Sequence, residues 1–177
     1  MKILSAVFCM AILVGCSSVT MKEPFPGSQL TEKEQNQLTG TWQLDESVVH
    51  VAFTSNGVPW LAAVEWQDND FVLNKSRLYF TKHNDALYVC MPTESDETSE
   101  YLFAEIKPAG KGINAWGPDA AYFGKLVESG TLKGSVERDE HSTSVKLETP
   151  AVEILELIAT NHAAIDYKTP LLFRKLD

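Results

Sequence analysis

The side chains that could act as nucleophiles, general bases or metal ligands lie far apart along this sequence. Four histidines occur without the spacing of a metal site or a catalytic pair: His50, His83, His141 and His162. The thiol of Cys90 lies in the strand-like apolar run Leu87–Met91, where a free cysteine is more often a small core residue than a nucleophile. The chain also lacks a Gly-x-Ser-x-Gly turn, a His-Glu-x-x-His helix and a glycine-rich phosphate loop. We therefore predict no enzyme activity; a hydrolase with an unrecognised site is the alternative.

The remaining polar motifs also favour structure over chemistry. The run Thr143–Lys146 holds a hydroxyl and an amine three residues apart, but it alternates as a strand does and does not begin a helix. The acidic runs 94–100 and 137–140 could attract a cation, yet they lack the glycine and the alternating oxygen ligands of a calcium loop. Solvated loops explain both runs, so we predict no metal and no cofactor.

The first sixteen residues carry the most specific pattern in the chain. Lys2 is followed by a run of apolar and small residues from Ile3 to Val14, which ends at Gly15 and Cys16. This run is shorter than the roughly 20 apolar residues that a membrane-spanning helix needs. Its length and its basic start fit the hydrophobic part of an export signal.

The end of that run, Leu13–Cys16, is a leucine, two short residues and a cysteine, and it resembles the lipobox of bacterial lipoproteins. The resemblance implies cleavage before Cys16, a diacylglyceryl group on its sulfur and a further acyl chain on the new amino terminus. Several acyl chains anchor a protein stably, whereas one does so only marginally. Ser17 implies sorting to the outer membrane, since an aspartate there commonly retains such proteins in the inner membrane. The alternative is an ordinary cleaved signal, or a buried helix with an incidental cysteine.

Composition bounds the rest of the chain. Removal of residues 1–15 leaves enough sequence for one domain. Residues 16–30 are mostly small and polar, with two prolines and a glycine, and predict a flexible tether before a single domain over 31–177. The formal charge of −9 argues against binding to nucleic acid or to lipid headgroups, because both are anionic. It leaves room for a basic protein partner.

Short strands dominate the pattern of the domain. The capping pattern Thr31–Glu34 predicts a short first helix. Beyond it, apolar runs alternate with polar turns such as Asn56–Gly57, which favours a hairpin. Helical spacing appears in two segments, at about 119–128 and 150–160. We predict a mainly β (α+β) fold, an antiparallel β-barrel or sandwich with these three helices.

A Gly-x-Trp motif lies on the first predicted strand, from Gly40 to Trp42, and Arg174 lies on the last one. With a helix near the C-terminus, this layout is similar to that of lipocalins. In lipocalins a late arginine packs over the tryptophan ring at the closed end of the barrel. The resemblance therefore implies that Arg174 stacks on Trp42 as a structural pair. An ordinary strand aromatic is the alternative for Trp42.

Aromatic side chains elsewhere could line a cavity or fill a core. We consider five of them as candidates for a pocket: Trp60, Trp66, Phe71, Phe103 and Trp116. We expect a lipoprotein, held on the outer membrane through Cys16, that binds a small apolar ligand in such a pocket. The alternative is a protein-interaction module of the cell envelope, either an assembly factor or an inhibitor of a basic periplasmic enzyme.

Overall fold

The structure is a computed structural model that describes residues 17–67, 70–93 and 100–176, with the backbone alone at residues 65–67 and 71. Within these residues the fold is mainly β, as predicted, and twelve strands form one large mixed sheet that does not close. The strands are β1 (Ser17–Met21), β2 (Gly40–Leu44), β3 (Ser47–Phe53), β4 (Pro59–Gln67), β5 (Asp70–Arg77), β6 (Tyr79–His83), β7 (Ala86–Pro92), β8 (Tyr101–Ala109), β9 (Gly112–Trp116), β10 (Gly134–Arg138), β11 (Thr143–Leu147) and β12 (Leu171–Leu176). The helices are α1 (Glu32–Leu38), α2 (Ala120–Glu128) and α3 (Ala151–Thr160), with a 3-10 turn at His162–Ala164. None of these helices is long and apolar enough to cross a membrane.

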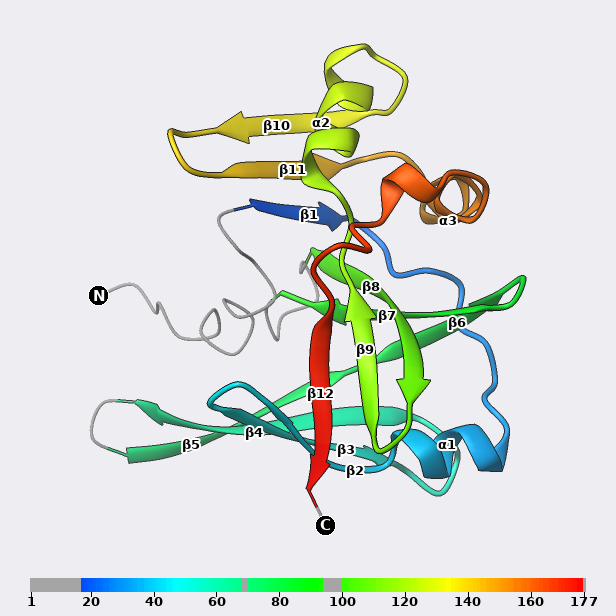
Figure 1. Ribbon diagram of the computed structural model, residues 1–177, viewed down its shortest axis with the longest axis vertical. Coiled ribbons are helices and arrows are strands. Elements are labelled where there is room, and N and C mark those ends of the chain that lie inside the picture. The colour runs from blue at the N-terminus through cyan, green and yellow to red at the C-terminus, as the bar shows by residue number, and fades with distance from the viewer. Residues whose placement is uncertain (1–16, 68–69, 94–99, 177) are drawn as a thin grey trace.

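The sheet divides into two regions at β8 (Figure 1). Along one edge, the start of β8 pairs with β1 and its later part pairs with β9, while β7 pairs along the other edge. On one side of this junction lie β1, β10 and β11 with α2 and α3, which we call the three-stranded region. On the other side lie β2–β7, β9 and β12 with α1, which we call the curved-sheet region.

In the three-stranded region, β1 lies parallel to β11, and β11 pairs antiparallel with β10. Both predicted later helices are confirmed here. The Asp119 carboxylate caps α2 by accepting a hydrogen bond from the Tyr122 N–H at 2.9 Å, and α3 follows Pro150. The inner faces of α2 and α3 bury Phe123 and Ile154 completely. These helices complete the core of a sheet that is too small to bury its own apolar face.

The tether predicted over residues 16–30 is wrong, because from Ser17 onward the chain folds as part of the domain. β1 buries Val19 and Met21. The segment after it buries Phe25, whose ring makes edge-to-face contacts with two aromatic rings at centroid distances of 5.9 and 5.2 Å. The composition resembles that of a linker because a five-residue strand needs few apolar residues to cover one face.

In the curved-sheet region, the strand order β9-β12-β2-β3-β4-β5 is antiparallel throughout. The hairpin predicted at Asn56–Gly57 joins β3 to β4, and Gly57 adopts a φ of +77° there. β5 continues through Leu78 into β6, which pairs with β7, so the chain passes from one side of this region to the other. A second apolar core lies between the two sides.

The barrel and the lipocalin form are not confirmed by this topology. Among the described residues, three strands have a strand neighbour on one side only, β5, β6 and β10, so the sheet keeps free edges. The parallel pairing of β1 with β11 also departs from the purely antiparallel sheet that the sequence predicts.

Candidate functional site

The apolar core of the curved-sheet region contains a cavity of about 150 Å³. Its wall combines residues of β2, β3 and β4 with residues of β6, β7, β8, β9 and β12. Among the described residues that line it, Ser47 supplies the one polar side chain. Six of the larger apolar residues in the wall are Trp42, Leu61, Phe80, Ile106, Ile113 and Phe173.

Strand alternation determines which side chains reach the cavity. Directly paired residues on antiparallel strands point to the same face of a sheet. Trp42 of β2 pairs with Val49 of β3, and Val51 of β3 pairs with Leu61 of β4; all four residues line the cavity. The wall is therefore built from every second residue of neighbouring strands, and residues between them face outward.

Trp42 is the largest residue of the wall, and contacts on two sides fix its ring. The indole Nε1–H donates a hydrogen bond to the Leu38 carbonyl oxygen at 2.9 Å, so its polar atom is satisfied away from water. The Nζ of Lys175 lies 5.2 Å from the ring centroid. Gly40 makes this contact possible, because a Cβ there would lie 2.6 Å from the Lys175 Cε and its φ of +135° suits glycine.

The sequence names Arg174 as the cation over Trp42, and this prediction is wrong by one residue. The register pairs Lys175 with Trp42 and Arg174 with Gln43. Because side chains alternate along a strand, Arg174 points to the opposite face. Its guanidinium there donates a hydrogen bond to Gln43 Oε1 at 2.6 Å. A cation does cover the ring, but it is an ammonium from the neighbouring position.

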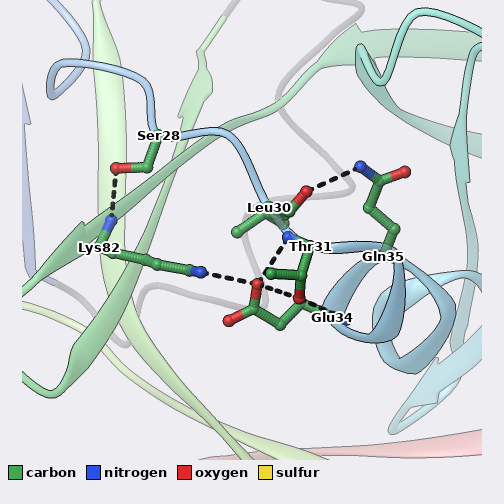
Figure 2. Close-up of polar contacts among 6 residues, drawn as sticks. All are labelled: Ser28, Leu30, Thr31, Glu34, Gln35 and Lys82. Atoms are coloured by element: carbon green, nitrogen blue, oxygen red, sulfur yellow. Dashed lines mark hydrogen bonds and ion pairs between the residues drawn. The ribbon is translucent and has the colours of Figure 1, made fainter.

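Helix α1 closes one end of the cavity, since its last residue, Leu38, is part of the wall. Figure 2 shows the contacts that hold the start of α1. The predicted capping box is present: Thr31 Oγ1 accepts a hydrogen bond from the Glu34 N–H, and the Glu34 carboxylate accepts one from the Thr31 N–H at 2.7 Å. The same carboxylate pairs with Lys82 of β6 at 2.7 Å. The backbone N–H of Lys82 also donates to Ser28 Oγ at 2.9 Å.

These contacts change the pKa of the Glu34 carboxyl. The Lys82 ammonium, followed by the two hydrogen bonds from Thr31, lowers the pKa of the Glu34 carboxyl from 4.5 to about 2. The carboxylate is therefore charged at any physiological pH, and it ties α1 to β6 across the end of the cavity. The sequence predicts the helix and its cap, but it gives no sign of Lys82 as a partner.

Two aromatic residues predicted to form the pocket do not line this cavity. Trp60 lies on the outer face of β4 with 40% of its surface exposed, one position away from the wall residue Leu61. Phe103 packs into the core of the three-stranded region, one position away from the wall residue Ala104. Residue type alone predicts both as pocket residues, whereas alternation along the strand determines which face of the sheet a side chain lies on.

The other predicted site residues have different outcomes. Trp116 is half-buried and packs against the core of the three-stranded region. The side chains of Trp66 and Phe71 lie outside the described part of the structure, although their backbones pair between β4 and β5. Cys16 also lies outside the described residues.

No titratable side chain lines the cavity among the described residues. Cys90, which is 1% exposed, belongs to the core of the three-stranded region, where burial raises the pKa of its thiol to about 12. It therefore stays protonated and unreactive at neutral pH. In the same described ranges, no three His, Cys, Asp or Glu residues gather in a way that could hold a metal ion. The site can therefore enclose an apolar molecule by its shape and its apolar wall.

One end of the acidic run 94–100 is described, and it is engaged within the protein. Glu100 accepts a hydrogen bond from Thr20 Oγ1 at 2.6 Å and pairs with Lys146 at 3.1 Å. Residues 94–99 lie outside the described residues. Glu100 thus connects β1 to β11 through side chains, in addition to their backbone pairing.

Comparisons with known proteins assign no family to this chain. It matches no model of a protein family, no curated protein and no solved structure.

Proposed function

We propose that this protein binds a small apolar molecule in the cavity of the curved-sheet region. The observation that carries the proposal is an apolar space of about 150 Å³ with a single serine in its described lining. An engineered apolar cavity of about 150 Å³ in another protein stays dry and takes up benzene or xenon. The expected ligand is a single ring or a short hydrocarbon segment. It carries no charge, because the described lining offers no partner for one.

The second part of the proposal is location. The protein is a lipoprotein held on the outer membrane by acyl chains on Cys16, and the support is the apolar run that ends in the lipobox Leu13–Cys16. The working mode is lipocalin-like, in that antiparallel strands surround an apolar interior. It is supported by the cation over Trp42 near the closed end of the cavity.

The binding test uses the segment Ser17–Asp177 without detergent, since detergent is itself an apolar ligand. Benzene is titrated into the protein by calorimetry. The filling variant is Ala115→Leu, because Ala115 lines the cavity and is 3% exposed. The matched control is Ala62→Leu, which adds the same atoms on β4 beside the wall residue Leu61 and points to the other face.

We expect wild type and Ala62→Leu to bind benzene with the same affinity. Ala115→Leu should bind it at least about tenfold more weakly, because the added leucine atoms occupy the space that benzene needs. Overpacking this space with both groups costs about 1–3 kcal/mol. Absence of benzene binding in wild type, or equal affinity in all three proteins, would refute the proposal.

A further inference from the structure

A second, smaller pocket of about 80 Å³ lies where the two regions meet. We call it the anchor pocket. Its described lining includes Ser17, Val19, Leu102, Phe103, Gly117 and Pro118. Three further residues line both this pocket and the main cavity: Val89, Met91 and Ala104. The two spaces are therefore neighbours that share part of a wall.

The position of Ser17 at the anchor pocket is fixed by the sheet. Ser17 is the paired partner of Thr143 in β11, and its hydroxyl oxygen accepts a hydrogen bond from the Thr143 N–H at 3.1 Å. The next residue, Ser18, pairs with Ser144, and their hydroxyl oxygens are 3.3 Å apart. Because consecutive Cα atoms are about 3.8 Å apart, any group bonded to Cys16 begins beside this pocket.

The described lining suits a hydrocarbon chain. It contains no charged side chain, and the hydroxyl oxygens of Ser17 and Ser18 already have hydrogen-bond partners in β11. The aliphatic side chains of Val19, Leu102 and Met91 contribute apolar surface. A chain that enters beside Ser17 meets the shared wall before it reaches the main cavity.

We propose that the first few methylene groups of one acyl chain on Cys16 lie in the anchor pocket, against Val89, Met91 and Ala104, since a space of about 80 Å³ holds only a short part of the chain. This inference rests on the lipid anchor of the proposed function and goes beyond it, because it assigns a protein site to part of the anchor. The start of the acyl chain is then separated from the ligand cavity by this shared wall, and the cavity is next to the point of membrane attachment.

Photo-crosslinking of the full chain tests this inference. Bacteria that express the protein with its own N-terminal segment are fed a palmitic acid analogue with a diazirine near the carboxyl end of the chain, which is the part that the pocket can hold. The purified protein is weighed intact, illuminated and digested, and cross-linked peptides are identified by mass spectrometry. We expect cross-links between the lipid on Cys16 and peptides that contain Val89–Met91 or Leu102–Ala104.

Two variants make the test specific. Gly117→Leu fills the anchor pocket, since a Cβ at Gly117 meets no atom within 4 Å and no left-handed φ excludes a side chain there. Ala62→Leu is the control on the outer face of β4. We expect Gly117→Leu to lower the yield of these cross-links about tenfold, because overpacking excludes the chain. Ala62→Leu should leave the yield unchanged.

The outcomes separate this inference from the proposed function. An intact mass without lipid on Cys16 overturns both the anchor and the acyl chain in the pocket. A lipidated protein whose cross-links go only to detergent or phospholipid, or to residues 3–14 of an uncleaved chain, overturns the pocket alone. A yield that Gly117→Leu does not change also overturns it. Benzene binding by Ser17–Asp177 is independent of each of these results.

Discussion

The two cores of this protein are packed differently. In the three-stranded region, Phe123, Val145 and Ile154 are 0% exposed, belong to one apolar cluster and line neither of the two pockets described above. In the curved-sheet region, Trp42 and Phe80 are almost as well shielded, at 4% and 5% exposure, yet they border a space of about 150 Å³. Burial from water and contact with neighbouring atoms are thus separate properties in this molecule.

The difference comes from what covers each sheet. Helices α2 and α3 project large side chains into the core of the three-stranded region. In the curved-sheet region strands face strands, and α1 closes only one end. Two inward positions of this region hold residues too small to span the gap, Ala104 and Ala115. A protein can therefore obtain stability from one region and keep an open volume in the other.

Truncation of one phenylalanine in each core should give the largest difference. We expect Phe123→Ala to lower the free energy of unfolding by about 4 kcal/mol, because its ring is surrounded on all sides. Phe80→Ala should cost about 2 kcal/mol, since part of its surroundings is already empty. Urea unfolding of both variants measures the two losses. Equal losses would contradict the comparison.

Replacement of a buried alanine by leucine should change the stability of the protein in opposite directions in the two regions. Ala164 is 0% exposed in the filled core, so Ala164→Leu should destabilise the protein by about 2 kcal/mol through overpacking. Ala115→Leu enters the cavity and should be neutral or stabilising by up to about 1 kcal/mol. Thermal unfolding provides the measurement, and destabilisation by both variants would show that the cavity cannot accept a side chain.

The filled core should also make stability depend on pH in the alkaline range. Burial raises the pKa of Cys90 from 9.0 to about 12. A raised folded-state pKa gives stability that is complete below the unfolded value and is lost as pH rises toward the folded one. We expect the free energy of unfolding to fall by about 1 kcal/mol per pH unit above pH 9.

The matching variant is Cys90→Ala, which removes the thiol and should flatten the decline between pH 9 and 10. Above pH 10 the buried tyrosines add to it, since burial also raises the pKa of Tyr88 to about 12. Urea unfolding at half-unit pH steps measures the slope. A wild type with no decline in that range would mean that the thiol ionises in the folded protein.

The smallest effect is expected at the closed end of the cavity. Glu34→Gln removes the ion pair with Lys82 and weakens the capping box, so it should cost about 0.5–1 kcal/mol at pH 7. The folded-state pKa is lowered to about 2, so this stability is present above pH 4.5 and is lost as pH falls toward 2.

The control for this prediction is Glu32→Gln, which removes the same charge from the first turn of α1 without a contact to Lys82. We expect its cost at pH 7 to be smaller than that of Glu34→Gln. The difference between the two variants should decrease steadily below pH 4.5, as measured by chemical unfolding from pH 7 to pH 2.5, because the folded carboxyl is protonated only near pH 2. A difference that keeps its pH 7 value down to pH 2.5 would assign the effect to packing instead of charge.

The sequence predicts local structure here much better than it predicts which residues meet. The cap at Thr31–Glu34, the turn at Asn56–Gly57 and the helices near 119–128 and 150–160 depend on neighbours in the chain, and all are confirmed. The strand β1 is missed because its partners lie far away in the sequence.

The errors at the site have one physical cause. A shift of one position along a strand moves a side chain to the other face of the sheet. Trp60 is a larger residue than Leu61, but Leu61 faces the cavity. Lys175 covers the ring of Trp42 where Arg174 was expected, again by one position. Residue type alone cannot resolve such a shift, because the register is set by pairing with distant strands.

The pairing of β1 also has a consequence for the order of events during synthesis. Ser18 and its partner Ser144 are 126 positions apart, so β1 takes its place only when nearly the whole chain is available. The hairpins of the curved-sheet region join sequence neighbours and can form earlier. The strand β1 therefore stays unpaired until late in synthesis, and its pairing with β11 is among the last steps that complete the sheet.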